Sequence, residues 1–593
     1  MKKELLTGNE AIALGARNGG LKIASAYPGT PSTEVLETIA KKYKNEIYAE
    51  WAPNEKVALE TAIGASVAGS RAMAVMKHVG LNVAADPFFT FAYTGGNAGL
   101  VVISADDPGM HSSQNEQDNR NYAKAAKVMM LEPSNSQDCY DFAKIAFKLS
   151  EEFDTPILIR LTTRVCHSKS IVLYDNAIDD KGMIVYKKNI SKFVATPANA
   201  IKMRAKIIDR EIAEKEFSKK SNLNDIIDNN SKKGIISSGI AYQYAGEVFG
   251  GSVSYLKLGI TYPLADDLIK DFAKDKDEIF IIEETDPYLE EHIKMLGINC
   301  IGKEKLPAFG ELNQDIIRKA FNISDRLNVQ KDLQKILQGI PPRPPALCAG
   351  CPHRAFFHLI RQKKDIIIYG DIGCYTLGSA SPLSALDTCF CMGGSISTAH
   401  GGAIANRKTG IRTIGVIGDS TFFHTGINSL MDIAYNNSNA ITIILDNRIT
   451  AMTGHQENPG TGKTLMGNLS KEIDISKLAE AFGFSLEQIF EIDPLDLENL
   501  DSILDEVLND KTKPYLLILK SPCILKKMDI GYKEKYGLNF KPLTVNEERC
   551  ISCKKCISIG CPAIEFLDIA KIDEISCTGC EICKQICPID AIE

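Results

Sequence analysis

The segment "IRTIGVIGDSTFFHTGINSLMDIAYNNSNAITIILDNRIT", residues 411–450, decides the fold of the larger part of this chain. It contains two nearly uncharged β-rich runs, one ending at Gly418 and one ending before Asn447, with a helix-like stretch between them. Such runs are typical of parallel strands that are covered on both faces of a sheet. The segment therefore predicts an α/β fold built on a parallel sheet.

Two polar residues follow these strands directly and form a candidate metal site. Asp419 follows the first run, and Asn447 follows the second one 28 residues later. Because ligands of parallel sheets bind beyond the carboxyl ends of the strands, we expect the two side chains to meet there. Mg²⁺ prefers oxygen ligands and shares them with phosphate, so a backbone carbonyl near Ile449 and a diphosphate could complete its shell. Gly418 and the helix that follows suit the close approach of an anion.

The same residues resemble the signature of thiamine diphosphate enzymes, Gly-Asp-Gly followed after roughly 25 to 30 residues by Asn, as a short βαβ span requires. This chain departs from the signature at Ser420, which stands where the second glycine is expected. The resemblance implies that Gly418, Asp419, Ser420, Asn447 and Ile449 bind Mg²⁺ and the diphosphate. The alternative is an ordinary strand-end aspartate of an α/β fold.

The last 44 residues contain eight of the seventeen cysteines, in the runs "CISCKKCISIGCP" (550–562) and "CTGCEICKQICP" (577–588). Three thiolates at three-residue spacing can bind one iron–sulfur cubane, and the cysteine before each proline reaches across to the other cluster. The tail thus resembles a bacterial ferredoxin domain with two [4Fe–4S] clusters. The first cluster is assigned to Cys550, Cys553, Cys556 and Cys587, and the second to Cys577, Cys580, Cys583 and Cys561.

Two structural zinc sites are the alternative for this tail, although zinc sites rarely place four cysteines in one such run. In a reducing compartment, clustered cysteines are more often metal ligands than disulfides. A tail of this kind moves single electrons and has no evident substrate pocket. We therefore expect the chemistry to lie upstream.

Alternating strands and helices upstream predict three α/β domains before the tail. Buried strands are expected within 70–80, 98–109 and 154–164, and a polar stretch around 218–233 indicates a linker. The proline-rich run "GIPPRPPALC" (339–348) marks a boundary near residue 340. We expect a pyrimidine-binding domain (1–190), a linker (191–232), a middle domain (233–340), a diphosphate-binding domain (341–540) and the ferredoxin domain (541–593).

The composition limits the class of protein. The 593 residues are 44% hydrophobic and 24% charged, with a net charge of −7, so disorder is not indicated. Mild acidity without a long Lys/Arg block argues against nucleic acid as a partner. The first residues do not read as a signal peptide, and no apolar run is long enough to cross a membrane. We expect a soluble, cytoplasmic protein.

Glu55 is the candidate for the carboxylate that thiamine diphosphate enzymes place against the aminopyrimidine of the cofactor. It opens a predicted helix with a small-residue face at Ala58, Ala62 and Ala65, which would allow close approach. Glu60 is the rival, and family spacing favours Glu55. The alternative role for Glu55 is a carboxylate that interacts with the helix dipole.

Four further motifs resemble the 2-oxo acid:ferredoxin oxidoreductase superfamily. They are "YPGTPST" (27–33), "CAGCPHR" (348–354), "GDIGCYTLG" (370–378) and "AMTGHQENPGTG" (451–462), the last with His455 where the family has glycine. The resemblance implies that Thr30 lies near the substrate carboxylate and that Thr453 belongs to a cofactor-binding loop. It also implies a third cluster on Cys348, Cys351, Cys374 and Cys523, for which four inert buried thiols are the alternative.

The domain order most resembles the indolepyruvate branch of that superfamily. This resemblance implies oxidative decarboxylation of aryl-pyruvates with CoA, giving aryl-acetyl-CoA and CO₂, with thiamine diphosphate and Mg²⁺ as cofactors and ferredoxin as the electron acceptor. It also implies a smaller beta subunit in an α2β2 heterotetramer. Two alternatives remain open: a non-oxidative 2-oxo acid decarboxylase, and an electron-transfer scaffold subunit for a separate catalytic chain.

Overall fold

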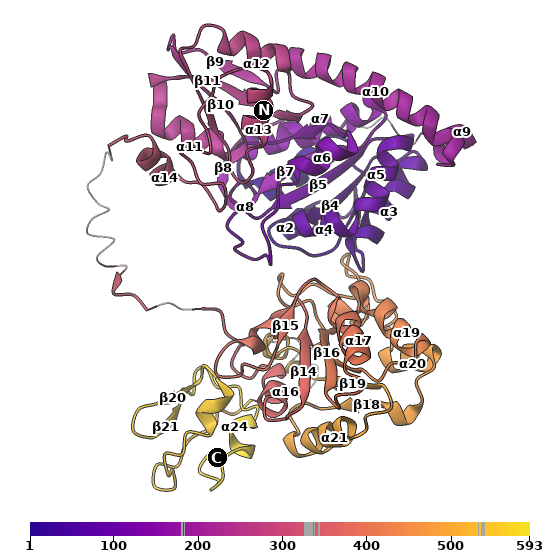
Figure 1. The fold of residues 1–593 in the computed structure, drawn as a ribbon, viewed down its shortest axis with the longest axis vertical. Helices are drawn as coiled ribbons and strands as arrows, with labels where there is room; N and C mark the ends of the chain where they lie inside the picture. Colours follow the sequence, from indigo (N-terminus) through magenta and orange to yellow (C-terminus); the bar gives the residue numbers. More distant parts are fainter. Residues whose placement is uncertain are drawn as a thin grey trace. The chain divides into compact units, whose positions relative to one another are not determined.

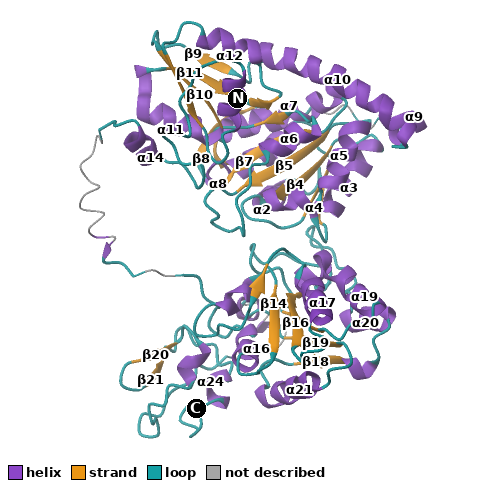
Figure 2. Cartoon of the chain, in the orientation of Figure 1, coloured by secondary structure: helices purple, strands orange, loops and turns teal. Residues whose placement is uncertain are grey.

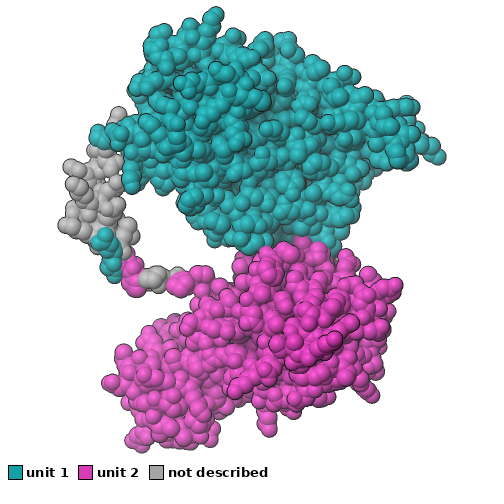
Figure 3. Space-filling view, in the orientation of Figure 1, with its two compact units in different colours: residues 1–339 teal, residues 340–593 magenta. Residues whose placement is uncertain are grey.

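The computed structural model describes residues 1–179, 182, 184–324, 336, 338–341, 344–529, 531, 533, 534 and 540–593. The chain forms two compact units, residues 1–339 and 340–593 (Figures 1 and 3). Each unit is described by itself. The predicted boundary near residue 340 coincides with this division, although residues 342 and 343 of the proline-rich run lie outside the described residues. The finer domain limits stay predictions.

Unit 1 is built on a seven-stranded sheet with the order β12-β6-β7-β5-β4-β2-β3, in which every pair is parallel except β12 with β6. The strands are β2 (Ile23–Ala26), β3 (Tyr48–Trp51), β4 (Ala72–Lys77), β5 (Leu100–Asp106), β6 (Met130–Leu131), β7 (Ile157–Thr162) and β12 (Ile260–Tyr262). The helices are α1 (Gly8–Asn18), α2 (Thr33–Lys42), α3 (Glu55–Val67), α4 (His78–Val83), α5 (Ala85–Thr94), α6 (Arg120–Ala126), α7 (Ser136–Phe153) and α8 (Thr163–His167). β1 (Lys2–Thr7) and β8 (Lys169–Tyr174) form a separate antiparallel ribbon.

The three strands predicted within 70–80, 98–109 and 154–164 are confirmed as β4, β5 and β7. β5 and β7 are buried along their whole length, and β4 is buried up to its last residue. This burial explains why their sequences lack the polar alternation of a one-sided sheet.

A second sheet of unit 1 has the order β13-β10-β11-β9. Its strands are β9 (Asp225–Ile227), β10 (Lys233–Ser238), β11 (Ser254–Leu258) and β13 (Glu278–Ile282). The accompanying helices are α9 (Ile190–Phe193), α10 (Pro197–Lys220), α11 (Gly239–Phe249), η1 (Gly250–Ser252), α12 (Asp266–Ala273), α13 (Tyr288–Met295) and α14 (Gln314–Ala320).

The region expected to be a linker has more structure than the sequence suggested. Its main element is the 24-residue helix α10, in which Arg210 donates hydrogen bonds to Ala92 O and Lys127 O of the first sheet's layer, both at 2.9 Å. In addition, β12 lies in the predicted middle domain yet pairs with β6 of the first sheet. The two sheets of unit 1 are therefore joined by more than a linker.

Unit 2 contains a six-stranded, fully parallel sheet with the order β15-β14-β16-β17-β19-β18 (Figure 2). The strands are β14 (Ile366–Gly370), β15 (Thr388–Cys389), β16 (Arg412–Gly418), β17 (Ile441–Asp446), β18 (Ile489–Ile492) and β19 (Tyr515–Lys520). The helices are α16 (His353–Ile360), η2 (Cys374–Ser379), α17 (Ser395–Ala405), α18 (Asp419–Thr421), η3 (Phe422–Gly426), α19 (Ile427–Tyr435), α20 (Ile475–Phe482), η4 (Leu486–Gln488), α21 (Leu497–Asn509) and α22 (Ile524–Met528). Apolar clusters cover both faces of this sheet, so the parallel strands predicted from 411–450 are confirmed.

The tail of unit 2 is a small irregular fold around its cysteines. It contains η5 (Cys556–Ile559), the antiparallel pair β20 (Ile564–Phe566) and β21 (Ala570–Ile572), and α24 (Ile582–Gln585). Its apolar core includes Ala355 of α16 and Leu497 of α21, so the tail packs on the parallel-sheet domain. No helix among the described residues is long and apolar enough to cross a membrane.

Candidate functional site

The carboxyl edge of the unit 2 sheet gathers buried carboxylates. Asp419, at the end of β16, is only 3% exposed and accepts a hydrogen bond from Asn458 Nδ2 at 2.9 Å. Asp446 ends the neighbouring strand β17 and is also buried. Burial raises the pKa of Asp419 above its ordinary value, and the nearby negative charge of Asp446 raises it further. Two buried, mutually repelling carboxylates form an edge whose oxygens suit a divalent cation.

Asn447 is held in a defined orientation beside this pair. Its Oδ1 accepts a hydrogen bond from Ile449 N at 3.2 Å, and its Nδ2 lies 3.4 Å from His353 Nε2. Burial lowers the pKa of His353 to about 4, so the ring is neutral at pH 7 and can accept that bond. Because an amide oxygen has two lone pairs, Oδ1 keeps the capacity to bind a cation.

The structure gives a physical reason for the serine that replaces the second glycine of the signature. Ser420 is buried and accepts a hydrogen bond from Thr450 Oγ1 at 2.8 Å, which ties the end of β16 to the loop after Asn447. Gly418 is different, because a Cβ there would lie 2.6 Å from the ring of Tyr375. Glycine is therefore required before Asp419 but not after it.

The loop carrying Thr453 is a short hairpin. Thr450 and Gln456 exchange two backbone hydrogen bonds at 2.9 and 3.2 Å, and Thr453 Oγ1 donates to Gln456 Oε1 at 2.6 Å. His455, which stands where the resemblance expects glycine, has φ of 69°. This left-handed conformation is the one that glycine adopts without strain, so the hairpin keeps the backbone shape despite the substitution.

Glu55 occupies the first turn of α3 in unit 1 and is 5% exposed. Its helix is capped by Asn54, whose Oδ1 accepts from Val57 N at 2.9 Å. Gly80 allows the carboxylate its position, because a Cβ there would lie 2.7 Å from Glu55 Oε1. The rival Glu60 is exposed and pairs with Lys56, so burial favours Glu55 as the functional carboxylate.

Thr30 lies in the turn after β2, beside a lysine that sequence reasoning missed. Lys77 ends β4, and its Nζ donates to Ser112 O at 3.0 Å, while Ser112 Oγ donates to Thr30 O at 3.4 Å. The aliphatic part of Lys77 lies against Gly29. A single lysine at the end of a strand belongs to no recognisable sequence motif, so the sequence alone did not indicate a role for Lys77.

The charge of Lys77 is poorly matched by its surroundings. The hydrogen-bond acceptor of its ammonium group is a neutral carbonyl. In the described part of the chain, no carboxylate forms an ion pair with this group within 4.0 Å. Burial lowers the pKa of Lys77 to about 8, although the charges of Asp107 and Glu55 act in the opposite direction. Unit 1 thus holds a half-buried lysine near Thr30.

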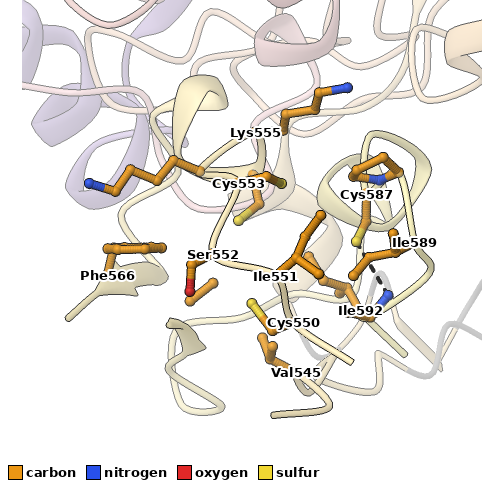
Figure 4. Close-up of a pocket in the computed structure, with 15 residues that line it drawn as sticks. Val545, Cys550, Ile551, Ser552, Cys553, Lys555, Phe566, Cys587, Ile589 and Ile592 are labelled. Atoms are coloured by element: carbon orange, nitrogen blue, oxygen red, sulfur yellow. Dashed lines mark hydrogen bonds between the residues drawn. The ribbon is translucent and has the colours of Figure 1, made fainter. Parts of the chain in front are cut away.

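The cysteines of the first predicted tail cluster line one small hollow. Figure 4 shows the sulfur atoms of Cys550, Cys553 and Cys587 around it, and Cys556 also lines it. Ala591 N donates to Cys587 Sγ at 3.3 Å. Backbone donors of this kind stabilise thiolates that ligate iron–sulfur clusters.

The second predicted set lines a separate small hollow. Its wall contains Cys561, Cys577, Cys580 and Cys583. Within the described ranges, no three His, Cys, Asp or Glu side chains converge as they would on one metal ion.

The four cysteines of the third predicted set come together from three segments of the chain, the loop 348–351 and the segments that carry Cys374 and Cys523. Burial raises the pKa of Cys351 to about 12, and the thiols of Cys348 and Cys374 contribute to the rise. Burial likewise raises the pKa of Cys374 to about 11, with contributions from Cys523 and Cys348. The backbone N of Cys523 also donates to Asn447 O at 2.9 Å. This set therefore lies next to the candidate metal edge.

Two family models identify the class of protein to which this chain belongs. Residues 371–519 match the family "Thiamine pyrophosphate enzyme, C-terminal TPP binding domain", and residues 14–230 match "Pyruvate flavodoxin/ferredoxin oxidoreductase, thiamine diP-bdg". Both matches agree with the superfamily resemblance seen in the sequence. The chain is a thiamine diphosphate-binding member of the 2-oxo acid:ferredoxin oxidoreductases.

The particular family follows from full-length relatives. The chain is 37% identical to indolepyruvate oxidoreductase subunit IorA of Archaeoglobus fulgidus, over 100% of this chain and 97% of the relative. It is 39% identical to the same subunit of Methanothermobacter marburgensis, over 99% and 97%. A 2-oxoglutarate:ferredoxin oxidoreductase structure from Magnetococcus marinus matches with a TM-score of 0.47 and 18% identity, over 54% of this chain and 65% of that one. The chain belongs to the indolepyruvate oxidoreductase IorA family.

Proposed function

We propose that this chain catalyses the oxidative decarboxylation of aryl-pyruvates with CoA and passes the two electrons singly to ferredoxin. The observation that carries the proposal is the hydrogen bond of 2.9 Å from Cys523 N to Asn447 O. This bond joins Cys523 of the third set to Asn447, one of the residues of the candidate metal site. An oxidation that starts at this edge thus has an electron acceptor beside it.

The residues of unit 2 fit the diphosphate end of the cofactor. Asp419, Asn447 and the Ile449 carbonyl would supply hard oxygens for Mg²⁺, and the cation would offset the repulsion between Asp419 and Asp446. Gly418 allows the close packing of the Tyr375 ring before Asp419, while Ser420 and Thr453 fix the loops that follow. When bound, thiamine diphosphate supplies the electron sink for the carbon that loses CO₂.

The residues of unit 1 fit the proton transfers and the substrate. With the cofactor bound, the buried Glu55 carboxylate would hydrogen-bond the aminopyrimidine and so set its tautomer. Lys77 and Thr30 receive the carboxylate of the 2-oxo acid, because an ammonium whose hydrogen-bond acceptor is a neutral carbonyl attracts an anion. The aryl specificity of the proposal rests on the names of the full-length relatives.

The cysteines supply the electron route. The two hollows of the tail would each hold a [4Fe–4S] cluster, and the third set would hold another beside Asn447. An aldehyde-releasing decarboxylase would not need such a route, and a scaffold subunit would not need Glu55, Asp419 and Asn447. The relatives are named as subunits, so we also propose a smaller beta subunit and an α2β2 assembly. We further propose a cytoplasmic location.

Two substitutions test the proposal by separating its halves. Glu55→Gln should slow CO₂ release at least 100-fold, while the clusters stay loaded. Cys577→Ala should spare cofactor binding and stop ferredoxin reduction. Glu60→Gln is the matched control, because Glu60 lies on the same helix but is exposed. Normal turnover by Glu55→Gln would overturn the thiamine assignment, and unchanged ferredoxin reduction by Cys577→Ala would show that the tail is not the exit.

A further inference from the structure

A buried arginine joins the third cysteine set to the tail. Arg354, in the first turn of α16, is 2% exposed. Its NH1 donates to Ile559 O at 2.8 Å and to Gly560 O at 2.6 Å. Its NH2 donates to Leu347 O at 2.6 Å and to Cys348 O at 3.1 Å. One guanidinium thus holds two segments that lie about two hundred residues apart in the sequence.

These bonds form a continuous path between two predicted cluster ligands. Cys348 belongs to the third set, and Gly560 directly precedes Cys561, which lines the second hollow of the tail. The path from Cys348 O through Arg354 to the Gly560 carbonyl uses hydrogen bonds of 3.1 and 2.6 Å. All of its other links are covalent.

A second close contact supports the same junction. A Cβ at Gly350 would lie 1.9 Å from Thr578 Oγ1, and Gly350 has φ of 70°. Thr578 stands between Cys577 and Cys580 of the second set. The loop 348–351 therefore touches the tail through glycine, and any side chain there would push the two apart.

The charge of Arg354 has no protein counterpart nearby. In the described part of the chain, no carboxylate lies within ion-pair distance of it, and its buried Nε has no hydrogen-bond partner. Buried arginines are usually paired with anions. Arg354 lines the second hollow together with Cys561, Cys577, Cys580 and Cys583, whose thiolates would be the nearest negative charges.

We propose that Arg354 is a positioning residue for electron transfer, which fixes the third cysteine set against the second tail set and places a buried positive charge between them. The inference rests on the proposed function, because it needs clusters at both sets. One electron crosses the junction in each step, while Arg354 keeps its proton and all its bonds. Its charge makes the second tail set easier to reduce, and its four carbonyl contacts keep the transfer distance constant.

The test compares Arg354→Gln with Arg354→Lys in the full chain, purified without oxygen and checked for equal iron content. Arg549→Gln is the matched control, since Arg549 is exposed, lies in the tail and donates to Ile589 O at 2.9 Å without touching the loop 348–351. Redox titration followed by electron paramagnetic resonance measures the potential of each cluster. Hydrogen exchange of residues 556–561 measures how firmly the tail is held.

Arg354→Gln should lower the potential of one tail cluster and speed exchange in 556–561 at least tenfold. Arg354→Lys should speed exchange but keep the potential close to that of the parent, because it keeps the charge. Gly350→Ala is the second variant, to be used if Arg354→Gln does not load iron, and should speed exchange without shifting the potential. Arg549→Gln should leave the exchange of 556–561 unchanged.

Unchanged potentials in iron-loaded Arg354→Gln would overturn the proposal, even if exchange rises, because a purely structural contact would then explain the residue. Unchanged exchange in both Arg354 variants would overturn it as well. A parent chain that binds no iron would overturn the proposed function instead. These two failures are distinguishable, because iron content is measured before either variant is compared.

Discussion

The carboxyl edges of the two main parallel sheets carry opposite charges. In unit 2 the strand ends present Asp419 and Asp446, two buried carboxylates that repel each other, and Arg448 NH1 lies 3.6 Å from Asp446 Oδ2. In unit 1 the corresponding edge presents Lys77, whose half-buried side chain places its ammonium against a neutral carbonyl. Two carboxylates thus share one arginine at the acidic edge, whereas Lys77 has no carboxylate partner among the described residues.

The difference is the basis of the ligand that we propose for each edge. The acidic edge fits a cation that also binds phosphate oxygens, whereas the basic edge fits a small carboxylate. In the proposed function, the same strand–helix architecture would serve the cofactor in one unit and the substrate in the other. Changes at each edge should consequently affect different steps of the reaction.

The largest expected effect is at the acidic edge. Asp419→Asn should weaken Mg²⁺-dependent binding of thiamine diphosphate on the order of 100-fold, because one of the hard ligands is lost. Calorimetric titration of the chain with cofactor at fixed Mg²⁺ measures this. Removal of Mg²⁺ with a chelator should have the same effect on the parent and little effect on the variant. Equal affinities of parent and variant would contradict the metal assignment.

The next effect is at the basic edge. Lys77→Met should raise KM for an aryl-pyruvate about tenfold or more, the value of one charge-assisted hydrogen bond, with cofactor affinity unchanged. Since the pKa of Lys77 is lowered to about 8, the parent should lose affinity for the 2-oxo acid as pH rises through that value. Lys77→Arg should shift this loss to higher pH. A KM that is independent of both the residue and pH would remove Lys77 from the site.

The lowered pKa of Lys77 also predicts how its replacement changes the free energy of unfolding with pH. Its folded pKa of about 8 lies below that of an unfolded lysine, so the charged form is disfavoured in the fold. The cost is fully present below pH 8 and disappears as pH rises toward 10.5. Lys77→Met should therefore stabilise unit 1 at pH 7 by up to about 3 kcal/mol, seen as a higher melting temperature. A gain that persists at pH 10.5 would need another explanation.

The smallest effect is in the hairpin beside the acidic edge. His455→Gly should not reduce stability, because φ of 69° suits glycine. Gly454→Ala is the matched change, and it should cost about 1–2 kcal/mol, since Gly454 has φ of 121°. Thermal unfolding of the two variants checks the contrast. A larger loss for His455→Gly than for Gly454→Ala would mean that the His455 side chain contributes more than its backbone costs.

Local patterns in the sequence predicted much of this molecule. The buried strands of both units follow from apolar runs, and the grouping of Cys561 and Cys587 with opposite tail sets follows from spacing alone. Both are decided by residues close in sequence. The family resemblance is likewise carried by short contiguous motifs.

Non-local contacts explain what the sequence did not predict. β12 is only three residues long and gains its place by pairing with β6, more than one hundred residues earlier. Helix α10 has a largely polar sequence and packs through few residues, including Arg210. Lys77 and Arg354 look like ordinary basic residues in the sequence. Only the structure shows that Arg354 is buried and that neither side chain has a carboxylate partner within the described residues.

The iron and acid-labile sulfide content of the anaerobically purified chain tests the central claim most directly, namely that an oxidation site is connected to the tail through a third cysteine set. Three clusters with four irons and four sulfides each would give about twelve irons and about twelve sulfides per chain. Loss of about four of each in Cys523→Ala, with the rest retained, would assign the third set. About eight of each in the parent would contradict the third cluster, and zinc without sulfide would contradict the electron route as a whole.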